Sequence, residues 1–333
     1  MADRQPVPHG PSPAGEQGVA VVCGGVGAAR FLRALGAVVD PAGITAVVNT
    51  GDDTVLNGFA ISPDLDTIVY TLAGAIDPER GWGLAGETWQ AMEALARYSA
   101  ARPSGSAAAT TWFNLGDRDL ATHMYRTARL AEGASPTVVA AEITAAWGVT
   151  VRLLPMSDDP VATMIRLADG GEIPFQDYFV RLRHDVPVTG VRFHGDHARA
   201  SDAVLAALGG AGCIVIAPSN PIVSIGPIRS LPGIDALLAA RRELVVAVSP
   251  IVGGAALKGP ADRMLRELGH EPSVVGVARL YAPIAGVLII DPADAALVSA
   301  VERAGMRPMV VPSVMRDPEV AAALARATID SVR

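Results

Sequence analysis

Residues 19–30 have the sequence VAVVCGGVGAAR, in which a short apolar run passes directly into a glycine-rich loop. The run Val19–Cys23 predicts a strand covered on both faces, as the strands of a parallel sheet are. The stretch Arg30–Val39 predicts the helix that follows. Glycines between a strand and a helix let the backbone approach an anion, and the start of the helix offers it free N–H groups. We therefore predict the first β–α unit of a doubly wound sheet, with a ligand at its edge.

The same alternation of apolar runs and Ala/Leu-rich stretches continues along the chain. Further strands are predicted at Ile44–Val48, Cys213–Ala217, Leu244–Ser249, Val274–Val277, Val287–Ile290 and Met309–Val311. Further helices are predicted at Thr67–Ala75, Trp82–Ala100, Leu120–Glu132, Thr137–Trp147, Ile234–Ala240, Ala261–Leu268, Ala293–Ala304 and Pro318–Val332. This order indicates the α/β class, a doubly wound, Rossmann-like and mostly parallel sheet.

Two segments depart from the alternation. Residues 149–195 contain short runs separated by turn signals, which predict an antiparallel β-rich insertion or an extension of the sheet. These runs are Thr150–Leu154, Met164–Leu167, Asp177–Leu182 and Val188–Phe193. Residues 1–18 are polar and rich in Pro and Gly, without the apolar core of a secretory signal, and predict a flexible tail. We expect one domain over residues 19–333, located in the cytoplasm.

Composition excludes several classes of protein. The 333 residues are 50% hydrophobic and 18% charged, so the chain is not disordered. A net charge of −7 argues against nucleic-acid binding, which requires basic surfaces. The two cysteines, Cys23 and Cys213, lie in apolar runs and indicate neither a disulfide framework nor a zinc site. Glycines and prolines interrupt the uncharged run 203–228, so it does not predict a membrane span.

Carboxylates gather in two loops at one predicted edge of the sheet. Asp52 and Asp53 follow the second strand, and Asp64 and Asp66 stand where the next helix begins. Ligands of open α/β sheets bind at the carboxyl ends of the strands. Several oxygen ligands without nitrogen or sulfur favour magnesium over zinc. The alternative for Asp64 is a helix cap.

Three more polar loops adjoin predicted strands or helices. Arg118 precedes a helix and either clamps a phosphate or pairs with its neighbours. Ser219 and Asn220 follow a strand and either contact a base or phosphate or form only a turn. Ser249 begins a second glycine-bearing connection, which leads to Lys258. Lys258 either meets a phosphate or is simply solvated.

In this order, the motifs resemble the 2-phospho-L-lactate transferase family, which includes phosphoenolpyruvate transferases. The resemblance runs from Gly24 to about Gly259, and each motif is weak alone but specific in combination. The matching stretches are Gly24–Gly27, Val47–Asp53, Ser62–Thr67, Asp77–Gly83, Leu115–Asp119, Leu154–Pro160, Phe175–Asp177, Ala217–Pro221 and Ser249–Ile251.

The resemblance implies a transferase in the biosynthesis of coenzyme F-420. A phosphorylated three-carbon acid, enolpyruvyl phosphate or 2-phospholactate, passes from its guanosine diphosphate adduct to the ribityl hydroxyl of the deazaflavin Fo. GMP leaves, and Mg²⁺ is required in the family. The resemblance also implies a homodimer. It does not decide which of the two acids is carried.

We assign the predicted site residues by motif. Asp53 and Asp66 are expected to hold the metal, with Asp52 as a third catalytic carboxylate. Asp66, Asp64 and Asn114 are expected to contact the deazaflavin; at the position of Asn114 family members often carry a basic residue. The nucleotide and its phosphates are assigned to Gly24, Gly25, Gly27, Arg118, Ser219, Asn220, Ser249 and Lys258.

Other functions remain as alternatives. The glycine-rich loop is also compatible with a tight turn, and a sister family of this fold binds nucleotide sugars as a non-catalytic regulator. Titration with a guanine nucleotide against a UDP-sugar separates that function from transfer. A Rossmann oxidoreductase is disfavoured because Arg30 stands where the GxGxxG fingerprint needs a small residue.

Overall fold

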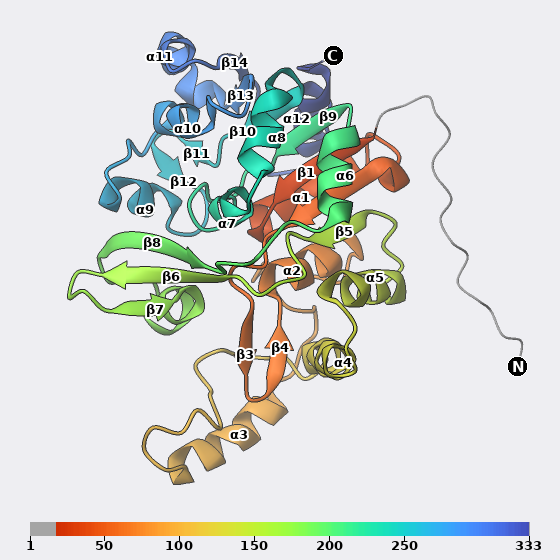
Figure 1. Ribbon diagram of the computed structural model, residues 1–333, viewed down its shortest axis with the longest axis vertical. Coiled ribbons are helices and arrows are strands. Elements are labelled where there is room, and N and C mark those ends of the chain that lie inside the picture. Colours follow the sequence, from red (N-terminus) through yellow and green to blue (C-terminus); the bar gives the residue numbers. More distant parts are fainter. Residues whose placement is uncertain (1–17, 333) are drawn as a thin grey trace, which may run out of the picture.

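A seven-stranded sheet with strand order β14-β13-β10-β9-β1-β2-β5 forms the centre of the molecule, and every neighbouring pair in it is parallel (Figure 1). The computed structural model describes residues 18–332, so all but Gly18 of the predicted tail lies outside the described residues. The strands are β1 (Val19–Cys23), β2 (Ile44–Val48), β5 (Arg152–Pro155), β9 (Cys213–Ile216), β10 (Val245–Val248), β13 (Val287–Ile290) and β14 (Arg307–Val310). The predicted doubly wound α/β class is confirmed.

Helices cover both faces of this sheet, which explains the continuous apolar runs. One face packs against α6 (Asp202–Gly210), α7 (Gly226–Ser230), α8 (Ile234–Ala240), α9 (Ala261–Glu267), α10 (Val274–Tyr281) and α11 (Val298–Arg303). The other packs against α1 (Gly25–Leu35), α2 (Pro63–Leu72), α5 (Pro136–Ala146) and α12 (Pro318–Asp330). Side chains of β1 alternate between these two cores, because successive residues of a strand point to opposite faces.

Smaller elements extend from the sheet. A hairpin of β3 (Thr54–Leu56) and β4 (Phe59–Ile61) turns at Asn57 and Gly58, both with positive φ. Figure 1 shows α3 (Gln90–Ala101) beyond this hairpin, at the far end from the main sheet. The remaining elements are α4 (Asp119–Ala131), the pair β11 (Ile251–Val252) and β12 (Ala255–Ala256), and the short helices η1 (Pro41–Gly43), η2 (Asp177–Arg181), η3 (Arg242–Leu244) and η4 (Pro292–Leu297).

The segment predicted as a β-rich insertion divides between two sheets. β6 (Ala162–Leu167), β7 (Glu172–Pro174) and β8 (Val188–His194) form an antiparallel sheet. Thr150–Leu154 forms β5, which extends the main sheet as the alternative predicts, but the prediction of antiparallel pairing is wrong, because β5 pairs in parallel with β2. It is also wrong for Asp177–Leu182, where η2 is a short π-helix.

Two other predictions fail for local reasons. Val274–Val277 was predicted as a strand but begins α10, because the Ser273 hydroxyl caps the helix by accepting from the N–H groups of Val275 and Gly276. The helix predicted over Trp82–Ala100 begins only at Gln90, because Gly83 and Gly86 adopt positive φ. The uncharged run 203–228 folds into α6, β9 and α7, and no helix within residues 18–332 is long and apolar enough to cross a membrane.

Candidate active site

The two carboxylate-bearing loops lie together at the carboxyl edge of the sheet. The Asn49 amide donates to Asp52 Oδ1 and to Asp64 Oδ2, at 3.0 Å in both cases. The Ser62 hydroxyl donates to Asp53 Oδ2 at 2.7 Å. These bonds join the loop after β2 to the first turn of α2, so the structure brings Asp52, Asp53 and Asp64 into one cluster.

Asp64 packs against the glycine-rich loop. A Cβ on Gly24 would lie 2.4 Å from Asp64 Oδ2, so only glycine allows this approach. The N–H of Gly25 helps to keep the Asp64 pKa down, because it stabilises the carboxylate. On the other side of the loop, the Ser219 hydroxyl donates to Gly24 O at 2.8 Å, and a Cβ on Gly27 would lie 2.4 Å from Pro218 O. The loop therefore joins Asp64 to the turn after β9.

A second carboxylate of α2 has a different partner. Both oxygens of Asp66 accept from the Arg126 guanidinium, and the Nη1 to Oδ2 distance is 3.1 Å. His123 Nδ1 lies 3.7 Å from Asp66 Oδ2, and its Nε2 lies 3.3 Å from Asp119 Oδ2. The Tyr70 hydroxyl donates to Asp119. A buried polar chain therefore extends from Asp66 along one face of α4.

Burial raises the pKa values of the carboxyl groups in this cluster. Burial raises the pKa of Asp64 to about 6, against the opposing effect of the Asn49 amide. Burial raises the pKa of Asp52 well above its usual range, and the charge of Asp64 raises it further. Asp53 faces the cavity, and the surrounding protein shields its carboxyl group from bulk water. This desolvation also raises the pKa of Asp53, although the hydrogen bond from Ser62 opposes it. A cation bound here would favour the ionised carboxylates.

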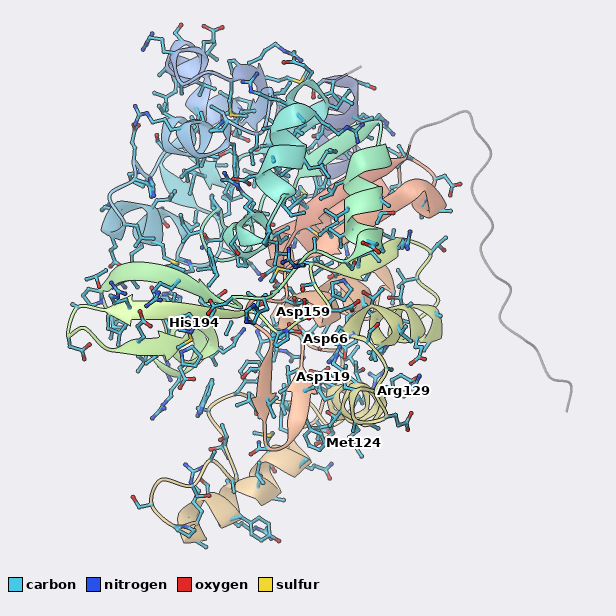
Figure 2. The ribbon with its side chains drawn as sticks, in the orientation of Figure 1. Asp66, Asp119, Met124, Arg129, Asp159 and His194 are labelled. Carbon is cyan, nitrogen blue, oxygen red and sulfur yellow. The ribbon has the colours of Figure 1, made fainter. Side chains whose placement is uncertain are left out.

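A cavity of about 740 Å³ opens beside this cluster. Asp53, Ser62, Asp66 and Arg126 line one part of it. The apolar wall is formed by Val55, Ile61, Leu65, Val69, Leu130, Val139, Ala140, Ile143 and Val161. Figure 2 shows Asp66 near Asp159, which also lines the cavity, while the lining residue His194 lies on the side of the antiparallel sheet. Such a cavity suits a large, mostly apolar ligand with a polar end.

The donor chemistry of this cavity fits magnesium. No group of three or more His, Cys, Asp or Glu side chains within residues 18–332 is arranged to hold a metal by itself. Asp53 and Asp66 nevertheless both face the cavity. Mg²⁺ is often held by one or two carboxylates, with water and substrate phosphates completing its shell. The oxygen-only donors therefore suit an ion that is completed by a phosphorylated substrate.

Of the predicted site residues, only Asp53 and Asp66 line this cavity. Arg118 is exposed, and its guanidinium donates to Ala85 O at 2.7 Å. Asn114 is exposed and Lys258 is exposed, and neither lines the cavity. Ser249 closes its own turn with Ile251.

Asn220 also stabilises a turn. Its side-chain oxygen accepts from the N–H groups of Ile222 and Val223. The structure thus groups the four aspartates with Gly24, Gly25 and Ser219, but gives Arg118 and Asn114 no contact with that group.

Several residues of the site received no functional role in the sequence prediction, although Asp119 and Gln176 lie within stretches that match the family. Asp119, Thr122, His123 and Arg126 are buried polar residues spaced by three, four and seven positions, which places them on one helix face. That spacing was the available signal. Gln176 was also missed, although its amide donates to Asp52 Oδ2 at 3.2 Å.

Comparison with known proteins gives a consistent result. A family model described as 2-phospho-L-lactate transferase CofD matches residues 19–324. A phosphoenolpyruvate transferase of Streptomyces griseus is 43% identical, over 94% of this chain and 97% of that protein. Phosphoenolpyruvate transferases of Thermobifida fusca and Mycolicibacterium smegmatis are each 41% identical over 94% of this chain, and over 97% and 98% of their own lengths.

Solved structures agree on the fold. A Bacillus halodurans protein, described as a member of the UPF0052 family, superimposes with a TM-score of 0.58 and 14% identity. The match covers 95% of this chain and 99% of that chain. At this level of identity, the similarity concerns the fold alone.

Proposed function

The chain belongs to the 2-phospho-L-lactate transferase CofD family and is a transferase, and from that premise we propose which groups it transfers. The donor is the guanosine diphosphate adduct of enolpyruvyl phosphate, and the acceptor is the deazaflavin Fo. The product is a precursor of coenzyme F-420, and GMP is released. The enolpyruvyl donor is favoured over 2-phospholactate by the names of the relatives, which are phosphoenolpyruvate transferases.

One observation carries this proposal: the cavity has an apolar wall and a carboxylate end, and the loops that bear those carboxylates also reach the glycine-rich loop through Asp64. We place the flat deazaflavin ring against the wall, with its ribityl hydroxyl toward Asp53 and Asp66. The diphosphate lies between these carboxylates and the N–H groups that begin α1. Ser219, in contact with Gly24, borders the guanosine side.

In the reaction, the ribityl oxygen attacks the phosphorus that carries the three-carbon acid. The bond from that phosphorus to the bridging oxygen breaks, and the bridging oxygen leaves with GMP. The hydroxyl proton passes to a carboxylate of the cluster, although a loose transition state needs little help from a base. Arg126 orients Asp66 by donating to both of its carboxylate oxygens.

Mg²⁺, when bound by Asp53 and Asp66, supplies positive charge to the diphosphate oxygens. N–H groups in the first turn of α1 beyond Gly24 and Gly25, which already donate to Ser219 and Asp64, add to this stabilisation because they are fixed before the reaction begins. Asp52 precedes Asp53 and accepts hydrogen bonds from Asn49 and Gln176. It therefore orients the loop that carries Asp53.

Mass spectrometry tests the proposal directly. We expect the protein, Mg²⁺ and Fo to give the enolpyruvyl product and GMP from the enolpyruvyl donor, and much less product from the 2-phospholactyl donor. A chelator should stop the reaction. Absence of product from both donors, with tight binding of a UDP-sugar, would establish the non-catalytic alternative.

A further inference from the structure

The loops that precede α3 and α4 cap each other's helices. Glu87 precedes α3, and its two carboxylate oxygens accept from the N–H groups of Arg118 and Asp119, each at 2.9 Å. Asp117 precedes α4, and its carboxylate accepts from the N–H groups of Gln90 at 3.0 Å and Ala91 at 2.9 Å. Each helix start is therefore satisfied by a residue from the other loop.

Glu87 occupies a specific capping position at the start of α4. Arg118, at the N-cap position of α4, makes no side-chain capping bond, so Glu87 takes that role from 31 positions earlier in the chain. A Cβ on Gly116 would lie 2.2 Å from Glu87 Cδ, so glycine is required there. A carboxylate at this position also stabilises the helix electrostatically, because the N-terminus of a helix carries partial positive charge.

The two capped helices differ in what they carry. α4 presents Asp119, His123 and Arg126 to Asp66, whereas α3 buries only Met92 and supplies no residue to the cavity. Asp119 is the first residue of α4 and lies directly under the cap. Figure 2 shows Asp119 and Asp66 in the same region of the molecule.

We propose that Glu87 is a positioning residue of the transfer reaction. By capping α4 it fixes Asp119 and, through His123, the Arg126 guanidinium that orients Asp66. Glu87 does not line the cavity, so it acts only through α4. The proposal rests on the proposed function, because it assigns Asp66 to the reacting site.

The reciprocal caps supply a matched control. Glu87→Ala removes the cap of α4, and Asp117→Ala removes the cap of α3. Glu87→Gln is the conservative variant, because its amide oxygen still accepts from one N–H. For each protein we would measure kcat and KM, the melting temperature, and hydrogen exchange of the amides of α3 and α4 without substrate.

For Glu87→Ala we expect exchange in the first turns of α4 to be at least tenfold faster and kcat to be at least tenfold lower, with little change in KM. Glu87→Gln should recover part of the loss. Asp117→Ala should accelerate exchange in α3 and change kcat less than twofold. Small misplacements of a reacting group are known to lower rates strongly.

Two results would overturn the proposal. One is a loss of kcat that follows the melting temperature equally in Glu87→Ala and Asp117→Ala. The other is faster exchange in α4 with unchanged kcat. If the wild-type protein forms no product, the proposed function itself fails. The positioning role is then judged without substrate, by whether Glu87→Ala alone weakens the Mg²⁺-induced rise in melting temperature.

Discussion

Asp64 and Asp66 lie two residues apart at the start of α2, yet the protein neutralises them in different ways. On the glycine side, Asp64 is held by dipoles, namely the Asn49 amide and the N–H of Gly25. On the charged side, which faces the cavity, Asp66 is held by the full charge of Arg126. The glycine side allows a backbone to approach closely, whereas the charged side fixes a carboxylate beside an open cavity. This difference suggests a phosphate site on one side and a metal-holding carboxylate on the other.

The largest expected effect is on the charged side. Arg126→Met should lower the free energy of unfolding by about 3–5 kcal/mol, because it leaves the buried Asp66 without its guanidinium partner. Adding Asp66→Asn should restore part of the loss, because the uncompensated charge is then removed. Chemical denaturation of the single and double variants measures both.

Arg129→Met is the control on the same helix. Arg129 pairs with Glu142 and Glu132 near the surface, so its loss should lower the free energy of unfolding far less than the loss of Arg126. Equal losses for Arg126→Met and Arg129→Met would refute the distinction between the two sides.

The next effect is on turnover. Asp53→Asn should lower kcat by about 10²- to 10³-fold, a range typical for loss of one preorganised electrostatic contact. The variant should also lose the Mg²⁺-induced rise in melting temperature, because Asp53 faces the cavity as a proposed ligand. Calorimetric titration with Mg²⁺ provides a second measurement. Retained turnover with normal Mg²⁺ dependence would place the metal elsewhere.

On the glycine side, the expected effect is a dependence of stability on pH. The folded pKa of Asp64, about 6, lies above its unfolded value of about 3.9, so between these values the folded protein retains a proton that the unfolded chain has released. The free energy of unfolding should therefore fall as pH rises from 4 to 6, by about 3 kcal/mol in total for this group.

Asp64→Asn isolates that contribution. The variant should show a flatter decline between pH 4 and 6 than the wild-type protein, measured by denaturation in the absence of divalent ions. The Asn49 amide can still donate to the new side chain, so the fold is preserved. Identical pH profiles would show that dipoles alone do not explain how Asp64 is held.

The glycine side can be predicted from the sequence far better than the charged side. The glycine side follows from local patterns, because an apolar strand, a glycine loop and a carboxylate-rich helix start each have a recognisable local signature. The charged side depends on Arg126 meeting Asp66 across 60 residues, and only the packing of α4 decides which helix face points inward. The failure at Val274–Val277 has a local cause instead, because a Ser273 cap outweighs the β-branched residues. The capping of α4 by Glu87 is equally invisible in sequence, since the two loops meet only in the fold.

The smallest expected effect tests how closely the glycine loop must approach Asp64. Gly24 has φ of −169°, which alanine also adopts, so Gly24→Ala adds only steric contact. The new Cβ would lie 2.4 Å from Asp64 Oδ2 and 3.1 Å from Asn49 Cβ. We expect a loss of about 1–3 kcal/mol, typical of overpacking. Gly43→Ala, with nothing within 4 Å, should be neutral. If the two variants are equally stable, the loop yields easily, and its closeness to Asp64 is not a fixed feature of the site.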